Sequence, residues 1–119
     1  MTKDYRIVIS DMISAIDTIG TYISGIDEVA FSQNKLVQDG VLLQLALIGE
    51  AARKLPTDIR PLAPDIPWNA VIGFRNIVIH EYANVSLGTA WRIAKTKLST
   101  LRDSLVALKS KIPNVSQPQ

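Results

Sequence analysis

The side chains with the clearest capacity for chemistry lie close together in the second half of the chain. Arg75, Asn76 and His80 stand in one mostly apolar segment, and Gly73 precedes them by two residues. Histidine is the side chain whose unperturbed pKa, about 6.5, suits both giving and taking a proton near neutrality. Arginine presents a planar set of donors that matches phosphate oxygens and stabilises charge developing on them. Residues of these types would serve proton transfer at a phosphate group.

The spacing of these residues predicts how they lie on a helix. Asn76 and His80 are four residues apart, so their side chains stand one above the other. Gly73 carries no side chain one turn below, which would let a substrate or a second helix approach. Arg75 and His80 are five residues apart, which is about 140° around a regular helix. They converge only if the helix end loosens or if a second chain completes the site.

Each of these residues also has an ordinary structural interpretation. A single histidine near a helix end more often caps the helix or packs than it catalyses. Arg75 stands in the middle of an apolar stripe, where arginine more often forms a buried or interface ion pair, here with Glu50 or Glu81. Tyr82 of the same segment would most often pack in the core with its hydroxyl at the surface. Taken singly, these residues leave the function open.

Apolar residues recur at steps of three and four through most of the chain, which predicts helices. Helices must therefore position these side chains. The first helix is predicted to begin near residue 5 and to end at Gly25. Ser32 or Asn34 is expected to cap a second helix that runs to residue 55. Gly40 within it should weaken or bend that helix.

Four prolines between residues 56 and 67 predict a connecting loop. A third helix is expected over residues 67–82 and a fourth from a cap at Ser86 to residue 112, where Pro113 stops it. No segment alternates with period two long enough to predict a strand. The fold class is therefore all-α, an antiparallel bundle of four to five helices. We expect one domain over residues 1–112 and a flexible C-terminal tail over residues 113–119.

Composition excludes several classes of function. The 119 residues are 47% hydrophobic and 20% charged, which predicts a packed core rather than disorder. The net charge of +2 does not indicate a uniformly basic nucleic-acid surface. The absence of cysteine removes disulfides, thiolate metal sites and a cysteine nucleophile. No apolar run reaches the roughly 20 residues that span a bilayer. We expect a cytoplasmic protein with no membrane partner, no metal and no cofactor.

The segment Arg75–Tyr82 resembles the R-x-x-x-x-H-x-Y motif of HepT-like HEPN toxins, including the asparagine that often follows the arginine. The surrounding sequence agrees with this resemblance. Residues 48–52 read IGEAA, which resembles a stretch of that family's second helix. Residues 66–76 resemble its proline–tryptophan and arginine–asparagine run, and Trp91 falls where the last helix often carries tryptophan. The likeness covers roughly residues 4–110, and the combination in this order is specific.

This resemblance implies the toxin component of a type II HEPN/MNT toxin–antitoxin system. Arg75 and His80 match the catalytic pair of a metal-independent endoribonuclease, and Asn76 matches its polar assistant. Family members form homodimers in which motifs from two chains line one cleft. Their antitoxin is a minimal nucleotidyltransferase (MNT), and the resemblance marks Tyr82 as the residue that this antitoxin adenylylates. In metal-independent cleavage of this kind, the 2′-hydroxyl of the RNA acts as the nucleophile. A dimer supplies two histidines, one as the base and one as the acid.

Two alternatives remain open at this stage. One is a non-catalytic HEPN module that binds a nucleotide or serves a nucleotidyltransferase as acceptor or dimerisation partner. The other is a helical dimerisation domain in which Arg75 and His80 form interface hydrogen bonds.

Glu50 and Arg53 are secondary cleft candidates together with Gly73, although pairing between the two charges is the favoured interpretation. Four cations of the fourth helix could follow an RNA backbone, but such a run is usually a solvated face: Arg92, Lys95, Lys97 and Arg102.

Overall fold

The computed structural model describes residues 4–84 and 87–113. This part of the chain is helical and contains no strand, which confirms the predicted fold class. Residues 114–119 of the predicted tail and the predicted cap Ser86 lie outside the described residues. The helices are α1 (Tyr5–Ile23), α2 (Glu28–Ser32), α3 (Lys35–Lys54), α4 (Trp68–Ile72), α5 (Phe74–Asn84), α6 (Gly88–Thr96) and α7 (Leu98–Ser110), with a 3₁₀ turn η1 (Arg60–Leu62).

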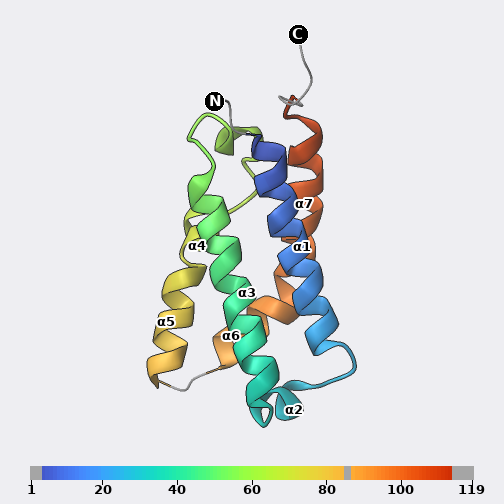
Figure 1. The fold of residues 1–119 in the computed structure, drawn as a ribbon, viewed down its shortest axis with the longest axis vertical. Helices are drawn as coiled ribbons and strands as arrows, with labels where there is room; N and C mark the ends of the chain where they lie inside the picture. Colours follow the sequence, from blue (N-terminus) through green and yellow to red (C-terminus); the bar gives the residue numbers. More distant parts are fainter. Residues whose placement is uncertain (1–3, 85–86, 114–119) are drawn as a thin grey trace.

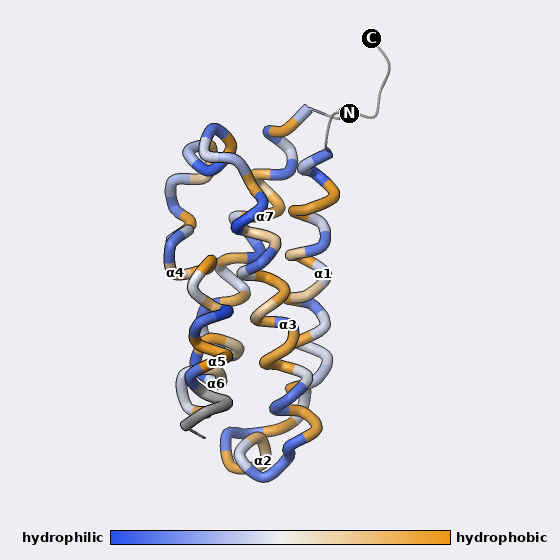
Figure 2. Tube along the Cα trace, turned by 60° about the vertical axis from the view of Figure 1, so that its left-hand side comes forward, coloured by the Kyte–Doolittle hydropathy of each residue, from blue (hydrophilic) through white to orange (hydrophobic). Residues whose placement is uncertain are grey.

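Three long helices, α1, α3 and α7, run side by side and form the body of the bundle (Figure 1). The α4–α5 segment packs along α3, and the short helix α2 closes the end of the bundle opposite the described ends of the chain (Figure 1). Hydrophobic and hydrophilic stretches alternate along the long helices, as expected for helices with one buried face (Figure 2). The largest side chains that are almost completely buried are Phe31, Ile9, Met12, Ile19, Leu45, Ile48, Leu55, Leu105 and Leu108.

No helix in the described part of the chain is both long and apolar enough to cross a membrane.

Local sequence signals set the ends of the first long helices. Gly25 adopts φ = 77°, directly after the C-cap of α1, a conformation that glycine accepts without steric cost. This confirms the predicted helix end. Asn34, rather than Ser32, caps α3, because its side-chain oxygen accepts a hydrogen bond of 3.1 Å from the backbone N–H of Val37. Gly40 does not interrupt α3, and it accommodates the ring of Tyr22, which would lie 2.8 Å from an added Cβ.

The predicted third helix is two helices, which corrects the single element expected over residues 67–82. Gly73 ends α4 with ψ = −5°, far from the helical value, and α5 starts at Phe74. The N–H of Gly73 donates to the carbonyl of Asn69 at 3.0 Å, while its own carbonyl accepts from Asn76 and Ile77. Gly73 therefore forms the break between the two helices, and the motif residues all belong to α5.

The predicted fourth helix is also broken, at Lys97, where φ is −110°. The two halves pack against different partners. Trp91 of α6 lies against Phe31 of α2, with ring centroids 5.1 Å apart, whereas α7 packs along α1. The apolar spacing does not predict α2, a five-residue helix that Asp27 caps and that buries Phe31. The proline-rich loop was predicted and holds one 3₁₀ turn.

Gly49 lets α3 approach the α4–α5 junction closely. A Cβ at this position would lie 3.0 Å from the carbonyl oxygen of Ile72, 3.1 Å from that of Val71 and 3.3 Å from the backbone nitrogen of Arg75. All three are backbone atoms, so the contact is between main chains rather than between flexible side chains. The close approach fixes the start of α5 against the C-terminal half of α3.

Replacement of Gly49 by alanine should therefore lower the free energy of unfolding by about 1–3 kcal/mol, the usual cost of overpacking a core. The added methyl group can be accommodated only by moving α4 away from α3. Thermal unfolding followed by circular dichroism measures the effect. Gly20→Ala in α1 is the matched control. It also replaces a helical glycine by alanine, but at an exposed position where the added Cβ would meet no atom within 4 Å. Equal stability of the two variants would contradict the need for glycine at position 49.

Candidate active site

Helix α5 presents the predicted site residues on its outer face. Arg75, Asn76, Ile79 and His80 are all exposed. The opposite side of the helix, represented by Phe74, is buried in the core. The exposed positions span an arc of about 140° on a regular helix, with Arg75 at one edge and His80 at the other. One copy of α5 thus displays the arginine and the histidine together, yet aims them in different directions.

Arg75 takes part in a cluster of three charges with α3. Its Nη1 lies 3.3 Å from Oε1 of Glu50, and Nη2 of Arg53 lies 2.8 Å from Oε2 of the same carboxylate. Arg53 Nε also donates to Oε1 at 3.4 Å. Glu50 therefore bridges two guanidinium groups, which confirms both the predicted pairing of Glu50 with Arg53 and the first of the two predicted partners of Arg75. The structure thus brings Glu50, Arg53 and Arg75 together.

Electrostatics favours the ionised forms of Glu50 and Arg53. Hydrogen bonds from Arg53 hold the pKa of Glu50 below its ordinary value, and the positive charges of Arg53, Arg75 and Lys54 act in the same direction. The same pairing raises the pKa of Arg53. The two guanidinium groups remain largely exposed, at 62% for the Arg75 side chain and 60% for Arg53. One negative and two positive charges leave the cluster with a net positive charge that faces solvent.

Apolar side chains are exposed beside these charges. Leu43 and Leu47 lie on the outer side of α3 and are 57% and 49% exposed, and Ile79 on α5 is 55% exposed. A small hollow of about 260 Å³ between the two helices is lined by Leu43 and by Val78 of α5. Within the described chain, Leu43 and Leu47 therefore face outward rather than into the core.

Tyr82 belongs to α5, two residues beyond His80. Its side chain and that of Glu81 lie outside the described part of the structure. The predicted role of Tyr82 therefore stays a prediction.

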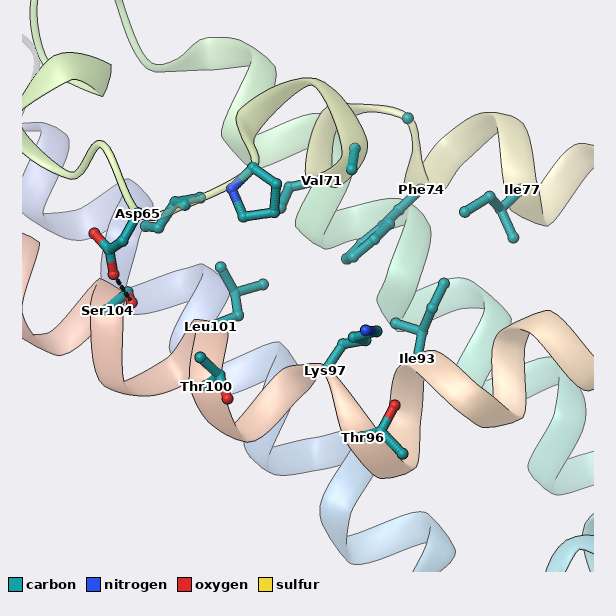
Figure 3. Close-up of a pocket in the computed structure, with 14 residues that line it drawn as sticks. Asp65, Val71, Phe74, Ile77, Ile93, Thr96, Lys97, Thr100, Leu101 and Ser104 are labelled. Atoms are coloured by element: carbon teal, nitrogen blue, oxygen red, sulfur yellow. Dashed lines mark hydrogen bonds between the residues drawn. The ribbon is translucent and has the colours of Figure 1, made fainter.

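The inner side of α5 borders a separate apolar cavity of about 750 Å³ (Figure 3). Phe74 and Ile77 line one wall, and Ile93 and Leu101 line the other, with Lys97 at the break between α6 and α7 (Figure 3). A hydrogen bond from the hydroxyl of Ser104 to the carboxylate of Asp65 lies at one end. Gly73 lines this cavity rather than the outer face, so the structure separates it from the arginine cluster.

The cations of the last two helices do not form one continuous row. Arg102 is bound to Asp17 of α1 at 2.6 Å, and Lys95 lies over the ring of Trp91, 5.4 Å from its centroid. Arg92 and Lys97 are exposed. This arrangement agrees with the interpretation of a solvated face.

Comparison with known proteins identifies the family. The family model described as Ribonuclease HepT-like matches residues 12–108. A "Putative RNase" of Methanocaldococcus jannaschii is 33% identical over 84% of this chain and 86% of its own length. A "Probable ribonuclease HepT" of Thermococcus cleftensis is 28% identical over 92% of this chain and 99% of its own length.

One relative is a longer protein. A "Gamma-glutamylcyclotransferase and putative RNase" of Methanocaldococcus jannaschii is 31% identical over 91% of this chain, which spans about half of that protein's length (49%). No solved structure matches the chain significantly. The family match covers α3 to α6 entirely and therefore includes both the Glu50 cluster and the motif helix α5. The chain belongs to the HepT-like ribonuclease family of HEPN helical domains.

Proposed function

We propose that this chain is the toxin of a type II toxin–antitoxin pair and cuts cytoplasmic RNA as a metal-independent endoribonuclease. The observation that carries the proposal is the exposure of Arg75, Asn76 and His80 on one helix of a HepT-like fold. Exposed side chains of this kind are accessible to a phosphate of an RNA backbone. The net positive cluster beside Arg75 adds electrostatic attraction for that backbone.

The chemistry assigned to the site is an internal transfer of the phosphate. The 2′-oxygen attacks phosphorus, the bond from phosphorus to the 5′-oxygen breaks, and the products end in a 2′,3′-cyclic phosphate and a 5′-hydroxyl. One His80 takes the 2′-hydroxyl proton and a second His80 donates a proton to the leaving oxygen. Arg75 binds the phosphate oxygens and stabilises the charge that develops on them. Asn76 orients His80 or donates to the phosphate.

A homodimer supplies the second histidine. Arg75 and His80 of one α5 point about 140° apart, so residues of one copy do not converge on a single phosphate. If two α5 helices pack antiparallel around their middle, Arg75 of each copy lies beside His80 of the other. The exposed apolar residues Leu43, Leu47 and Ile79 border this face and provide surface that such a contact would bury. The proposed cleft is therefore composite, with both motifs along its walls.

Positive side chains take over the role that a metal ion has in other nucleases. Glu50 is the carboxylate in contact with Arg75 in the described chain, and it is already paired with two guanidinium groups. A carboxylate engaged in this way is a poor ligand for a divalent cation. The test is incubation of the purified protein with RNA in the presence of EDTA, with analysis of the product ends. Products ending in 2′,3′-cyclic phosphate support the proposal, while cleavage that depends on added Mg²⁺, or intact RNA, contradicts it.

We infer that an MNT nucleotidyltransferase antitoxin silences the toxin by transferring AMP to the hydroxyl of Tyr82. Tyr82 lies two residues beyond His80 on the motif helix. An AMP group there would place a bulky anion beside the cleft, where it could occupy the phosphate site through Arg75 and repel RNA.

Mass spectrometry of the protein co-expressed with the product of its neighbouring gene should find an added AMP on Tyr82. Tyr82→Phe, which removes only the acceptor oxygen, should lose the modification and retain toxicity in the presence of the antitoxin. An unmodified protein in a tight complex would contradict silencing by modification and indicate steric blocking. Modification of the phenylalanine variant at another residue would contradict the assignment to Tyr82.

A further inference from the structure

We propose that Glu50 is a positioning residue for Arg75, holding its guanidinium in the orientation that the cleavage step requires. The inference rests on the proposed ribonuclease function and adds to it a residue outside the R-x-x-x-x-H motif. It depends on three independent observations: the contact geometry, the main-chain packing beneath it and the balance of charge.

The contact geometry leaves Arg75 both restrained and available. Glu50 accepts one hydrogen bond from Arg75, through Nη1 at 3.3 Å. Among the described residues no other acceptor is bound to that guanidinium, and the Arg75 side chain is 62% exposed, so its other donors can reach a phosphate. Arg53 makes the two-point contact, with Nε at 3.4 Å and Nη2 at 2.8 Å. Arg53 therefore anchors the carboxylate, and the carboxylate in turn orients Arg75.

The backbone beneath the cluster defines its position. Gly49 precedes Glu50, and a Cβ at Gly49 would lie 3.3 Å from the backbone nitrogen of Arg75. Two main chains in such close contact fix where both side chains originate. The ion pair with Glu50 then restricts the side-chain torsions of Arg75 that the main-chain contact leaves free.

The charge balance distinguishes positioning from substrate binding. Glu50 is negative and lies beside the predicted path of an anionic RNA, so it opposes binding of the substrate. A carboxylate at this place can assist the reaction only through the residue that it holds. Removing its charge should leave RNA binding unchanged or stronger while the chemical step becomes slower. A loss of folding would instead weaken RNA binding and slow the chemical step together.

The test is the variant Glu50→Gln, which keeps the shape of the side chain and removes the charge. We expect kcat for RNA cleavage to fall by about tenfold to a hundredfold, as for a misplaced catalytic group. We expect KM to stay equal or decrease. In the Arg75→Ala background, Glu50→Gln should cause no further loss beyond about twofold, because a residue acting only through Arg75 is not additive with it.

Asp17→Asn is the matched control. Asp17 is an exposed carboxylate that also accepts two hydrogen bonds from one arginine, from Arg102 Nε at 2.6 Å and from Arg102 Nη2 at 3.1 Å. This pair joins α1 to α7 and does not involve α5. Its replacement should leave kcat and KM unchanged. A full additive loss in the Arg75→Ala background, an unchanged kcat for Glu50→Gln, or an equal loss for Asp17→Asn would each overturn the proposal.

A second measurement does not depend on activity. The Nε–Hε signal of Arg75 in nitrogen-15 relaxation experiments should show less motion than that of Arg92, an exposed arginine of α6. Glu50→Gln should increase the motion of Arg75 to the level of Arg92. Equal motion of Arg75 in both proteins would overturn positioning even if RNA is cut. Restrained motion in a protein that cuts no RNA would retain the contact and contradict the proposed function instead.

Discussion

Replacement of His80 by alanine is expected to lower the rate of RNA cleavage by at least about a thousandfold, the combined effect of losing a general base and a general acid. The chain contains one histidine, so the two copies of a dimer lose both proton-transfer groups with a single substitution. The side chain is exposed on α5, and its removal should leave the core intact. Growth inhibition should disappear together with cleavage.

The measurement is single-turnover cleavage of a labelled RNA in EDTA, with the unfolding temperature recorded for both proteins. An unchanged unfolding temperature separates loss of chemistry from loss of fold. Cyclic phosphate ends should vanish in the variant. Undiminished cleavage by purified His80→Ala would contradict the assignment of His80, and it would favour the interpretation of this histidine as a structural residue.

Arg75→Ala is expected to reduce cleavage by about a hundredfold to a thousandfold, the cost of removing one donor that stabilises a developing oxyanion. Arg75→Lys should recover only part of this loss, because lysine offers a point charge in place of a planar fork. The ion pair with Glu50 is exposed, and pairs of this kind contribute about 0–1 kcal/mol to stability. The unfolding temperature of Arg75→Ala should therefore change little.

Arg92→Ala provides the comparison for Arg75→Ala, because it removes an exposed arginine from α6, outside the cluster with Glu50. It should retain most of the cleavage activity. The rival interpretation of Arg75 as a dimer-stabilising residue predicts a different result, in which Arg75→Ala weakens association and unfolding stability. A monomeric or markedly destabilised Arg75→Ala protein would support that interpretation. Equal losses for Arg92→Ala and Arg75→Ala would show a general charge effect.

Periodicity and capping residues were sufficient to predict the helical fold and several helix ends. Gly25 and Asn34 act locally. Gly25 adopts a left-handed backbone conformation after α1, and the side chain of Asn34 accepts a hydrogen bond from the first turn of α3. The breaks at Gly73 and Lys97 could not be predicted in this way. Each depends on packing against distant helices, and the apolar spacing continues across both junctions.

The predicted site was recovered unevenly for a similar reason. A partnership between Arg75 and Glu50 was one of two predicted alternatives. It depends on the close main-chain contact between Gly49 and the start of α5, which brings together Glu50 and Arg75, 25 residues apart in the sequence. The position of Leu47 in the sequence does not show that this apolar side chain faces outward. Its exposure appears only once α3 has been packed against its neighbours.

The proposed cleavage mechanism requires a cleft that uses histidines from both copies of the chain. The most direct test mixes wild-type protein with His80→Ala, refolds them together and measures cleavage per wild-type chain. If a dimer needs both histidines, activity should fall to about half at equal amounts and to about a quarter with a threefold excess of the variant. His80→Ala carrying Leu47→Glu, designed to be unable to dimerise, should leave activity unchanged. Unchanged activity with His80→Ala itself would contradict the shared cleft.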